Sequence, residues 1–348
     1  MAKSKRGKSK AKIEAEYRKK IGTARNIIIS VVAMSLAVFI IMIIAALLNE
    51  GVSTFISNLL SMNLFYFSIA LLIVFISNIM RYPKWELYMK KLGVKLSRAK
   101  NIALYLSMYS MEITPGRWGR AVVSYTINRL TGKKFAVTFP AVVADIFTDF
   151  LGFIVVTLAA AFLIGEYFWL SVGIAVLLML PFIFFYFEVP FAFIKKRFGR
   201  MKRMREFFEN ATLYFKSNRK ISYSDYIYSM ALTIPSMAVN GVALYFVILA
   251  FGVNISPSLM PEVIFIFSSS LLLGMITGIP AALGVTDAAL LGYLILFFGG
   301  SGLTFGVATL ITIFFRIANW WFVEGFGFAA LAYTSKYWKF GAVMPKKA

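Results

Sequence analysis

The chain has 348 residues, 60% of them hydrophobic, and its 37 Lys and Arg outnumber 15 Asp and Glu to give a net charge of +22 at pH 7. The long apolar runs exceed the roughly 20 residues that a membrane helix needs and lack the alternation of strands, which indicates an all-α integral membrane protein. The absence of Cys and His excludes disulfides, Cys/His zinc sites and histidine general bases.

The first part of the chain predicts two spans. A basic tail over residues 1–26 precedes a span at about Ile27–Leu48, and the second span covers about Leu64–Met80. The loop between the two spans carries Glu50 and no basic residue, so the positive-inside rule puts it outside. The loop after the second span is basic and is therefore expected inside; its residues include Arg81, Lys84, Lys90, Lys91 and Lys95.

The segment Ser97–Leu130 is moderately apolar but is interrupted by Pro115, Gly116 and Gly119. Basic residues flank it on both sides, so it begins and ends on the inside. We interpret it as a re-entrant hairpin; the alternative is an amphipathic pair of helices on the membrane surface.

Four further spans follow with alternating orientation, at about Phe135–Ile164, Phe168–Phe187, Tyr226–Phe251 and Leu303–Thr334. A second basic tail covers residues 335–348. Because the basic residues flank the predicted inner ends, we expect a multi-pass plasma-membrane protein with both termini in the cytoplasm. The same flanking position favours anionic lipid headgroups at the inner face over nucleic acid as partners.

A second broken segment, Val263–Phe298, is interrupted at Pro280 and Gly284. It is either a re-entrant hairpin that enters from the outside or two short full spans. The order of spans and broken segments then predicts a polytopic helical bundle that forms one domain, residues 27–334. The two halves of this domain, about 27–164 and 168–334, are predicted to be an inverted-topology repeat. Broken segments in matching places of inverted halves point to a central binding site.

Charged residues inside these apolar segments are the candidate functional groups. Arg117 and Arg120 follow the first break and suit a phosphate or carboxylate, although both could extend to the inner headgroups instead. Asp145 and Asp149 share one face of a helix, and we expect them to pair with Arg117, Arg120 or Arg316. A structural ion pair and a role in gating are equally compatible with this pattern.

Three more charges lie in the second half. Asp287 follows the second break at the start of a helix, where it is expected to cap that helix or to line a cavity. Arg316 lies well inside the last apolar run and needs a carboxylate or a ligand. Glu324 lies about two turns further on, nearer the inner face.

Residues 115–119 (PGRWG), followed by Asn128, Arg129 and Gly132, resemble the first motif of the flippase-like membrane family, which includes the transmembrane region of lysylphosphatidylglycerol synthases. Residues 280–290 (PAALGVTDAAL) resemble its second motif, often Pro-Gly-Gly-x-Gly-x-Arg-Glu. The resemblance covers about 27–334 and implies lipid translocation, with two re-entrant hairpins that meet near the middle of the membrane.

The sequence departs from the family pattern at three places. Arg120 stands where an acidic residue is common in the family. Ile146 replaces an Arg beside Asp145, and Thr286 replaces the Arg before Asp287. These changes imply an altered headgroup preference. The aminoacyl-transfer domain of the synthases is absent from this sequence, so lipid aminoacylation is not expected.

We therefore predict a flippase for a lipid with an anionic or phosphate-bearing headgroup, and not an enzyme. Arg117, Arg120 and Arg316 would bind the headgroup, while Asp145, Asp149, Asp287 and Glu324 would balance charge or gate. No nucleotide-binding loop motif occurs, which favours facilitated or gradient-coupled movement, and we expect no cofactor and no metal. The alternatives are a membrane enzyme or enzyme subunit acting on polyprenyl-linked sugars and a scaffold that recruits anionic lipid; a homo-oligomer is compatible with each.

Overall fold

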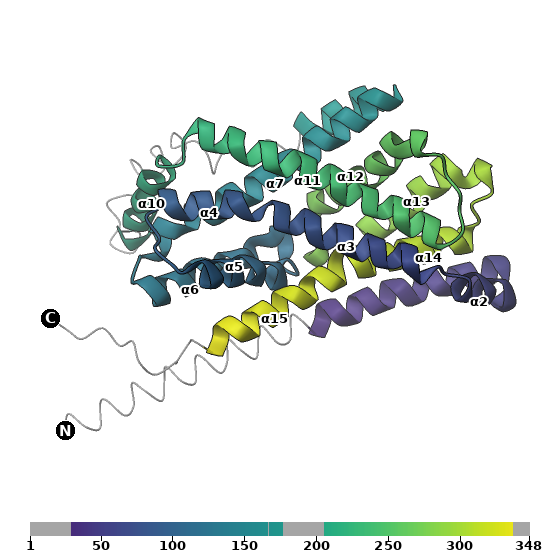
Figure 1. Cartoon of the computed structure of the whole chain (residues 1–348), viewed down its shortest axis with the longest axis horizontal. Coiled ribbons are helices and arrows are strands. Elements are labelled where there is room, and N and C mark those ends of the chain that lie inside the picture. Colours follow the sequence, from purple (N-terminus) through teal and green to yellow (C-terminus); the bar gives the residue numbers. More distant parts are fainter. Residues whose placement is uncertain (1–28, 166, 177–204, 337–348) are drawn as a thin grey trace.

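The computed structural model describes residues 29–165, 167–176 and 205–336, and every element within them is a helix (Figure 1). These residues include seven helices that are long and apolar enough to cross a membrane. The prediction of an all-α, polytopic membrane protein is therefore confirmed. The seven are Ile29–Glu50, Leu64–Lys91, Phe135–Ile164, Tyr223–Ala250, Pro257–Met275, Pro280–Phe298 and Phe305–Thr334.

The predicted bounds of several spans agree with the helices. Helix α7 covers Phe135–Ile164, as expected, and ends at Gly165, whose positive φ of 82° closes the helix. Helix α11 covers Tyr223–Ala250 and begins at a capping box in which Asp225 bonds back to Ser222. The predicted span Phe168–Phe187 and both basic tails lie wholly or partly outside the described residues.

The second span differs from its prediction. Helix α3 (Leu64–Met80) is followed directly by α4 (Tyr82–Lys91), with only a turn at Arg81 between them. Arg81 and Lys84 were expected in a loop on the inner side, but both are buried. The prediction of a loop is wrong here because the helix continues into the protein interior instead of ending at the membrane surface.

The last predicted span is a helix with an irregular middle. Helix α14 (Phe305–Arg316) passes through one π-helical turn, η7 (Ile317–Trp321), into α15 (Phe322–Lys336). Such turns occur frequently at functional sites in membrane and soluble helices. At its other end, α14 begins against Glu50, whose carboxylate accepts a hydrogen bond from the backbone N–H of Gly306 at 2.5 Å.

The two broken segments form two helical hairpins. The first consists of α5 (Arg98–Ser107), the short turns η1 (Tyr109–Met111) and η2 (Pro115–Ala121), and α6 (Val122–Thr131). The second consists of α12 (Met260–Ile276), the tip η5 (Pro280–Ala282) and α13 (Val285–Phe298). In Figure 1, α5 and α6 lie toward the left end of the molecule and α13 toward the right end.

The tips of the two hairpins meet inside the molecule. Turn η2 contacts η5, and a small apolar cluster joins the tips through Ile113 and Leu283, with Val31 and Trp320 packed on them. Pro and Gly interrupt both helices at these points, so the chain can turn back within the bundle. Their entry into the membrane from opposite sides, and the inverted repeat, stay predictions.

The remaining helices pack the two halves of the chain together. Helix α3 packs on α11, α7 packs on α12, and α10 (Arg205–Asn218) covers α7. Three short elements, α2 (Val52–Leu60), η4 (Pro257–Leu259) and η6 (Gly299–Ser301), complete the connections. The interior is mainly apolar, and Phe267, Leu104 and Trp85 are among its largest buried side chains.

A close contact fixes the last helix against the first hairpin. A Cβ atom added at Gly327 of α15 would lie 2.2 Å from the backbone nitrogen of Ser110, so only glycine allows this approach. Two residues earlier, at Gly325, a Cβ atom would meet no other atom within 4 Å. The two glycines of one helix therefore differ sharply in what a methyl group would do.

We predict that Gly327→Ala lowers the free energy of unfolding by about 1–3 kcal/mol, because α15 must move away from η1 to make room. Gly325→Ala is the matched control and should be neutral or stabilising by up to about 1 kcal/mol, since alanine favours the helix. Thermal unfolding in detergent, followed by circular dichroism, measures both. Equal effects of the two substitutions would contradict the close packing of α15 on η1.

Candidate functional site

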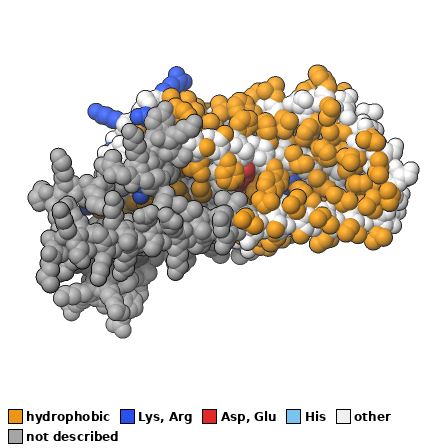
Figure 2. Space-filling model, turned by 90° about the horizontal axis from the view of Figure 1, so that it is seen from below, with side chains coloured by type: hydrophobic (Ala, Val, Ile, Leu, Met, Phe, Trp, Pro, Cys, Tyr) orange, Lys and Arg blue, Asp and Glu red, His pale blue; other side chains and the backbone are white. Residues whose placement is uncertain are grey.

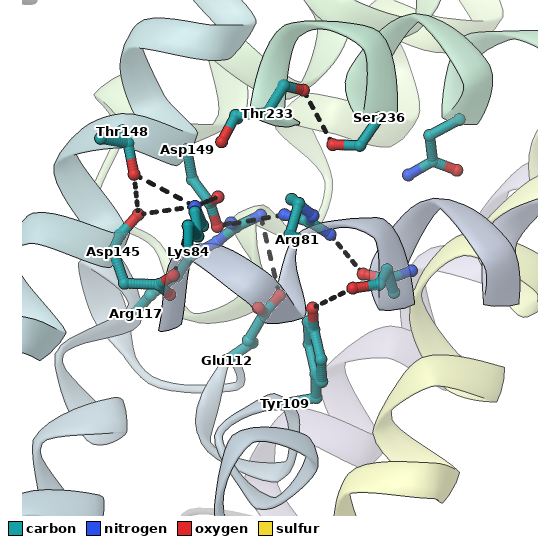
Figure 3. A network of polar contacts seen from close by, with 12 residues as sticks. Arg81, Lys84, Tyr109, Glu112, Arg117, Asp145, Thr148, Asp149, Thr233 and Ser236 are labelled. Atoms are coloured by element: carbon teal, nitrogen blue, oxygen red, sulfur yellow. Dashed lines mark hydrogen bonds and ion pairs between the residues drawn. The ribbon is translucent and has the colours of Figure 1, made fainter. Parts of the chain in front are cut away.

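Seven charged residues are joined by ion pairs where α3, α4, the first hairpin and α7 meet. Figure 3 labels all of them except Arg120. We call this set the ion cluster; its members are Arg81, Lys84, Glu112, Arg117, Arg120, Asp145 and Asp149. Charges this far from water are stable only when they are paired with good geometry. Four cations against three carboxylates leave one net positive charge.

Asp149 is the centre of the ion cluster. Its carboxylate lies 3.1 Å from Arg81 Nη1, 2.5 Å from Lys84 Nζ and 3.2 Å from Arg120 Nη1. It sits near the middle of the 30-residue α7, about 20 Å from either end at about 1.5 Å per residue. A single carboxylate thus contacts cations that come from α4, from the turn before it and from η2.

Arg120 is fully enclosed by carboxylates. Its Nη1 lies 2.7 Å from Asp145 Oδ2, its Nη2 bonds to Glu112, and the ring of Tyr109 lies 5.7 Å from the guanidinium carbon. Its side chain is 2% exposed. Both terminal nitrogens of Arg120 are bonded to carboxylates, and its buried Nε has no hydrogen-bond partner within the described residues. Arg120 therefore holds the first hairpin against α7 and has few terminal N–H groups left for a ligand.

Arg81 and Lys84 approach the same carboxylates from the side of α3 and α4, as Figure 3 shows. Lys84 Nζ lies 3.2 Å from Asp145 Oδ1 and donates to Thr148 Oγ1 at 3.1 Å. Arg81 also bonds to the side chain of Asn78. These two cations were not among the residues predicted for the site.

Arg117 differs from the other cations of the ion cluster. Its closest carboxylate oxygens, on Asp149 and Glu112, lie 3.6 and 3.7 Å away, beyond normal hydrogen-bond length. Its side chain is 21% exposed, whereas those of Lys84 and Arg120 are 1% and 2% exposed. Arg117 is therefore the cation whose guanidinium is most available to another anion.

Arg316 lies at the second hairpin and not in the ion cluster. Its Nε lies 2.8 Å from Asp287 Oδ1, its Nη2 donates to the carbonyl of Ala281 at 3.1 Å, and it stacks on the ring of Trp320 at 5.3 Å. Asp287 in turn accepts a hydrogen bond from the backbone of Gly284 at 2.8 Å. Asp287 caps its helix, as expected. Of the three candidate partners of Asp145 and Asp149, Arg316 pairs with Asp287 instead.

The backbone at both tips takes conformations that side chains disfavour. Arg117 has a φ of 61°, and Ala281 and Ala282 have φ values of 56° and 53°. The left-handed region costs non-glycine residues of order 1–3 kcal/mol, and such residues cluster at functional sites. The two alanines stand where the motif that this segment resembles has two glycines, a residue that takes this backbone conformation without a steric penalty.

Glu324 is a buried carboxylate outside the ion cluster. The residue is 3% exposed, and neither of its oxygens has a hydrogen-bond partner within the described part of the chain. The backbone N–H of Ile113 lies near it, and Glu112 and Arg117 lie within electrostatic range. The position of Glu324 in an apolar run marks it as a candidate, but its orientation toward the first hairpin depends on how α15 packs.

Small polar side chains extend along α11 beside the ion cluster. Ser229, Thr233, Ser236 and Asn240 are all buried, and their spacing puts them on one face of the helix. Figure 3 shows Thr233 and Ser236 above Asp149. At the far end, Asn240 donates to Asn319 of η7 at 2.9 Å. A row of polar groups therefore runs from the ion cluster to the π-helical turn beside Arg316.

The comparison of this chain with known proteins agrees with the family that its two Pro/Gly motifs resemble. The family model described as the lysylphosphatidylglycerol synthase TM region matches residues 28–327. A UPF0104 membrane protein from Methanothermobacter thermautotrophicus is 22% identical over 294 residues, which covers 77% of this chain and 85% of that protein. The family match includes both hairpins and the whole ion cluster.

We predict that Asp149→Asn destabilises the protein by about 3–5 kcal/mol, because it leaves buried cations without their shared carboxylate. Glu86→Gln is the control: Glu86 pairs at 3.6 Å with Lys90, whose side chain is 71% exposed, and such pairs contribute about 0–1 kcal/mol. Thermal unfolding of the purified variants measures the difference. If Asp149→Asn lowered the stability of the protein no more than Glu86→Gln does, the central role of Asp149 would be refuted.

We also predict that Ala282→Gly does not destabilise the protein, because glycine adopts the left-handed conformation without a steric penalty. The control is Ala288→Gly in the exposed part of α13, where glycine should cost about 1 kcal/mol of helix stability. The two midpoints of thermal unfolding are compared with that of the unchanged protein. If both substitutions lowered the midpoint of thermal unfolding equally, the backbone at residue 282 would carry no strain.

Proposed function

Because the chain belongs to the family of the lysylphosphatidylglycerol synthase transmembrane region, we propose that it is a lipid flippase for a phosphate-bearing, anionic headgroup. The observation that carries the proposal is the ion cluster, a set of buried charges with one excess positive charge at the place where two hairpin tips meet. An anionic headgroup would neutralise that excess. The lipid tails would remain in the membrane while the headgroup crosses.

Arg117 is the residue we assign to the headgroup. Its carboxylate partners are more distant than those of Arg120, and it is the most exposed cation of the ion cluster. A guanidinium binds phosphate oxygens with two parallel hydrogen bonds, which a loosely held arginine can exchange for its internal ion pairs. Arg81, Lys84 and Arg120 would keep the site electropositive, and Arg316 would support the second tip.

The surface of the molecule supports access from the membrane. Figure 2 shows a face covered with hydrophobic side chains, with a small acidic and a small basic patch exposed near its middle. Lys and Arg side chains project mainly toward the left end of that view, the end where α4, α5 and α6 lie in Figure 1. We place this basic end in the cytoplasm and the protein in the plasma membrane.

The proposal predicts that the purified protein, reconstituted in vesicles of phosphatidylcholine and phosphatidylglycerol, moves acyl-labelled fluorescent phosphatidylglycerol between leaflets. Arg117→Ala should slow this movement about tenfold, since it removes a charged hydrogen bond worth about 1.5 kcal/mol. Arg117→Lys should slow the lipid movement less than Arg117→Ala does, because lysine keeps the positive charge. Lys95→Ala, at an exposed position, is the control and should move lipid normally.

Bleaching of the outer-leaflet fluorophore by a membrane-impermeant reductant measures the movement. If protein-containing and empty vesicles bleach alike, the protein does not move this lipid. If purified protein then converts a polyprenyl-linked sugar, the enzyme alternative holds in place of the flippase. Equal rates for Arg117→Ala and the unchanged protein would remove Arg117 from the headgroup site.

A further inference from the structure

Glu324 occupies a position that the proposed headgroup site leaves unexplained. Its side chain lies on the face of α15 that approaches the first hairpin, because Gly327, three residues later on the same face, contacts the backbone of Ser110. A carboxylate is costly to bury without a donor, yet neither oxygen of Glu324 has one within the described residues.

The charged and titratable groups around Glu324 come from few elements. Helix α15 packs on α3, α5, η1 and η7. In α5, Arg98 and Lys100 are exposed to solvent, and in α5 and η1 the hydroxyls of Tyr105 and Tyr109 bond to each other at 2.7 Å. Neither α3 nor η7 carries a charged side chain, and Tyr66, near the start of α3, is the remaining titratable group.

Glu112 and Arg117 remain as the charged groups that act on Glu324. Glu112 belongs to the ion cluster, where it bonds to Arg120 and lies 3.7 Å from Arg117. Two carboxylates that face each other away from water repel when both are ionised, and sharing one proton removes the repulsion. Glu324, which has no cation of its own, is the member of the pair that can accept this proton.

We propose that Glu324 is a proton-binding site coupled to the anionic headgroup, so that the lipid moves together with a proton. The inference rests on the proposed function and adds its coupling ion. With Glu324 ionised, its charge cancels the single excess positive charge of the ion cluster. With Glu324 protonated, the excess returns, and a headgroup with one negative charge is attracted to Arg117.

The proton balance follows from this charge count. Headgroup binding takes one proton from the adjoining aqueous phase onto a Glu324 oxygen, which forms one O–H bond, and headgroup release returns that proton to water on the opposite side. One negative charge and one proton thus cross together, and no net charge is moved. By linkage, the affinity for the headgroup rises as pH falls, at most about tenfold per pH unit for one proton.

The test uses the vesicles and the labelled phosphatidylglycerol of the flippase assay, in mildly acidic and mildly alkaline buffers. The unchanged protein should move the lipid faster in acid. Glu324→Gln, which imitates the protonated acid, should move it at a rate that no longer depends on pH. Glu86→Gln should keep the pH dependence of the unchanged protein, because Glu86 lies in α4 outside the ion cluster.

The outcomes separate this inference from the proposed function. Movement that is independent of pH in the unchanged protein, or a pH dependence that survives in Glu324→Gln, overturns the coupling and leaves the flippase intact. A protein that moves no labelled lipid at any pH overturns the flippase function for this lipid. The proton site is then decided by a second measurement that needs no transport.

That measurement is infrared difference spectroscopy of the purified protein. The unchanged protein should show a protonated-carboxyl band that is absent in Glu324→Gln and that grows when phosphatidylglycerol is added. If Glu324→Gln fails to fold, titration of the band in the unchanged protein with and without the lipid still tests the coupling. A spectrum without that band across the stable pH range, or a band insensitive to the lipid, overturns the inference.

Discussion

The neutralisation of buried cations by Asp145 and Asp149 is the constraint on which this architecture depends. In an environment of low polarity, an unpaired charge costs several kcal/mol, so each cation must reach a carboxylate wherever it lies in the sequence. Arg120 brings the first hairpin to α7, and Lys84 brings α4 to the same residues. The ion cluster therefore fixes three separate segments of the chain around one point in the middle of α7, and this point is next to the contact between the two hairpin tips.

The same arrangement separates arginines that look alike in sequence. Arg120 is enclosed and structural, whereas Arg117, three residues earlier, lies at longer distances from its carboxylates and is partly exposed. The left-handed backbone at Arg117 turns its side chain away from the path that a regular helix would give it. The proposed headgroup residue and the framework that supports it thus come from neighbouring residues of a single short turn.

Sequence could predict the parts of the fold that depend on local chemistry. The apolar run of α7 and the breaks at Pro115 and Pro280 are local signals, and helices and turns follow them. Arg81 and Lys84 escaped prediction because a basic residue after an apolar run is typical of a membrane boundary. Their burial depends on carboxylates more than 60 positions away in the chain. The partner of Arg316 could not be chosen for the same reason: four carboxylates lie in the apolar segments, and only the contact between α13 and α14 selects one.

The order of the charges along the chain has a consequence for biogenesis. Arg81, Lys84, Arg117 and Arg120 all leave the ribosome before Asp145 and Asp149. Until α7 is synthesised, Glu112 is the one carboxylate of the ion cluster that can offset these four cations. The early segments therefore cannot settle at their final depth in lipid. The first hairpin must wait in a hydrated or insertase-protected location and can move inward only after the arrival of α7. Assembly of the amino-terminal half is thereby timed by a helix that is translated after it.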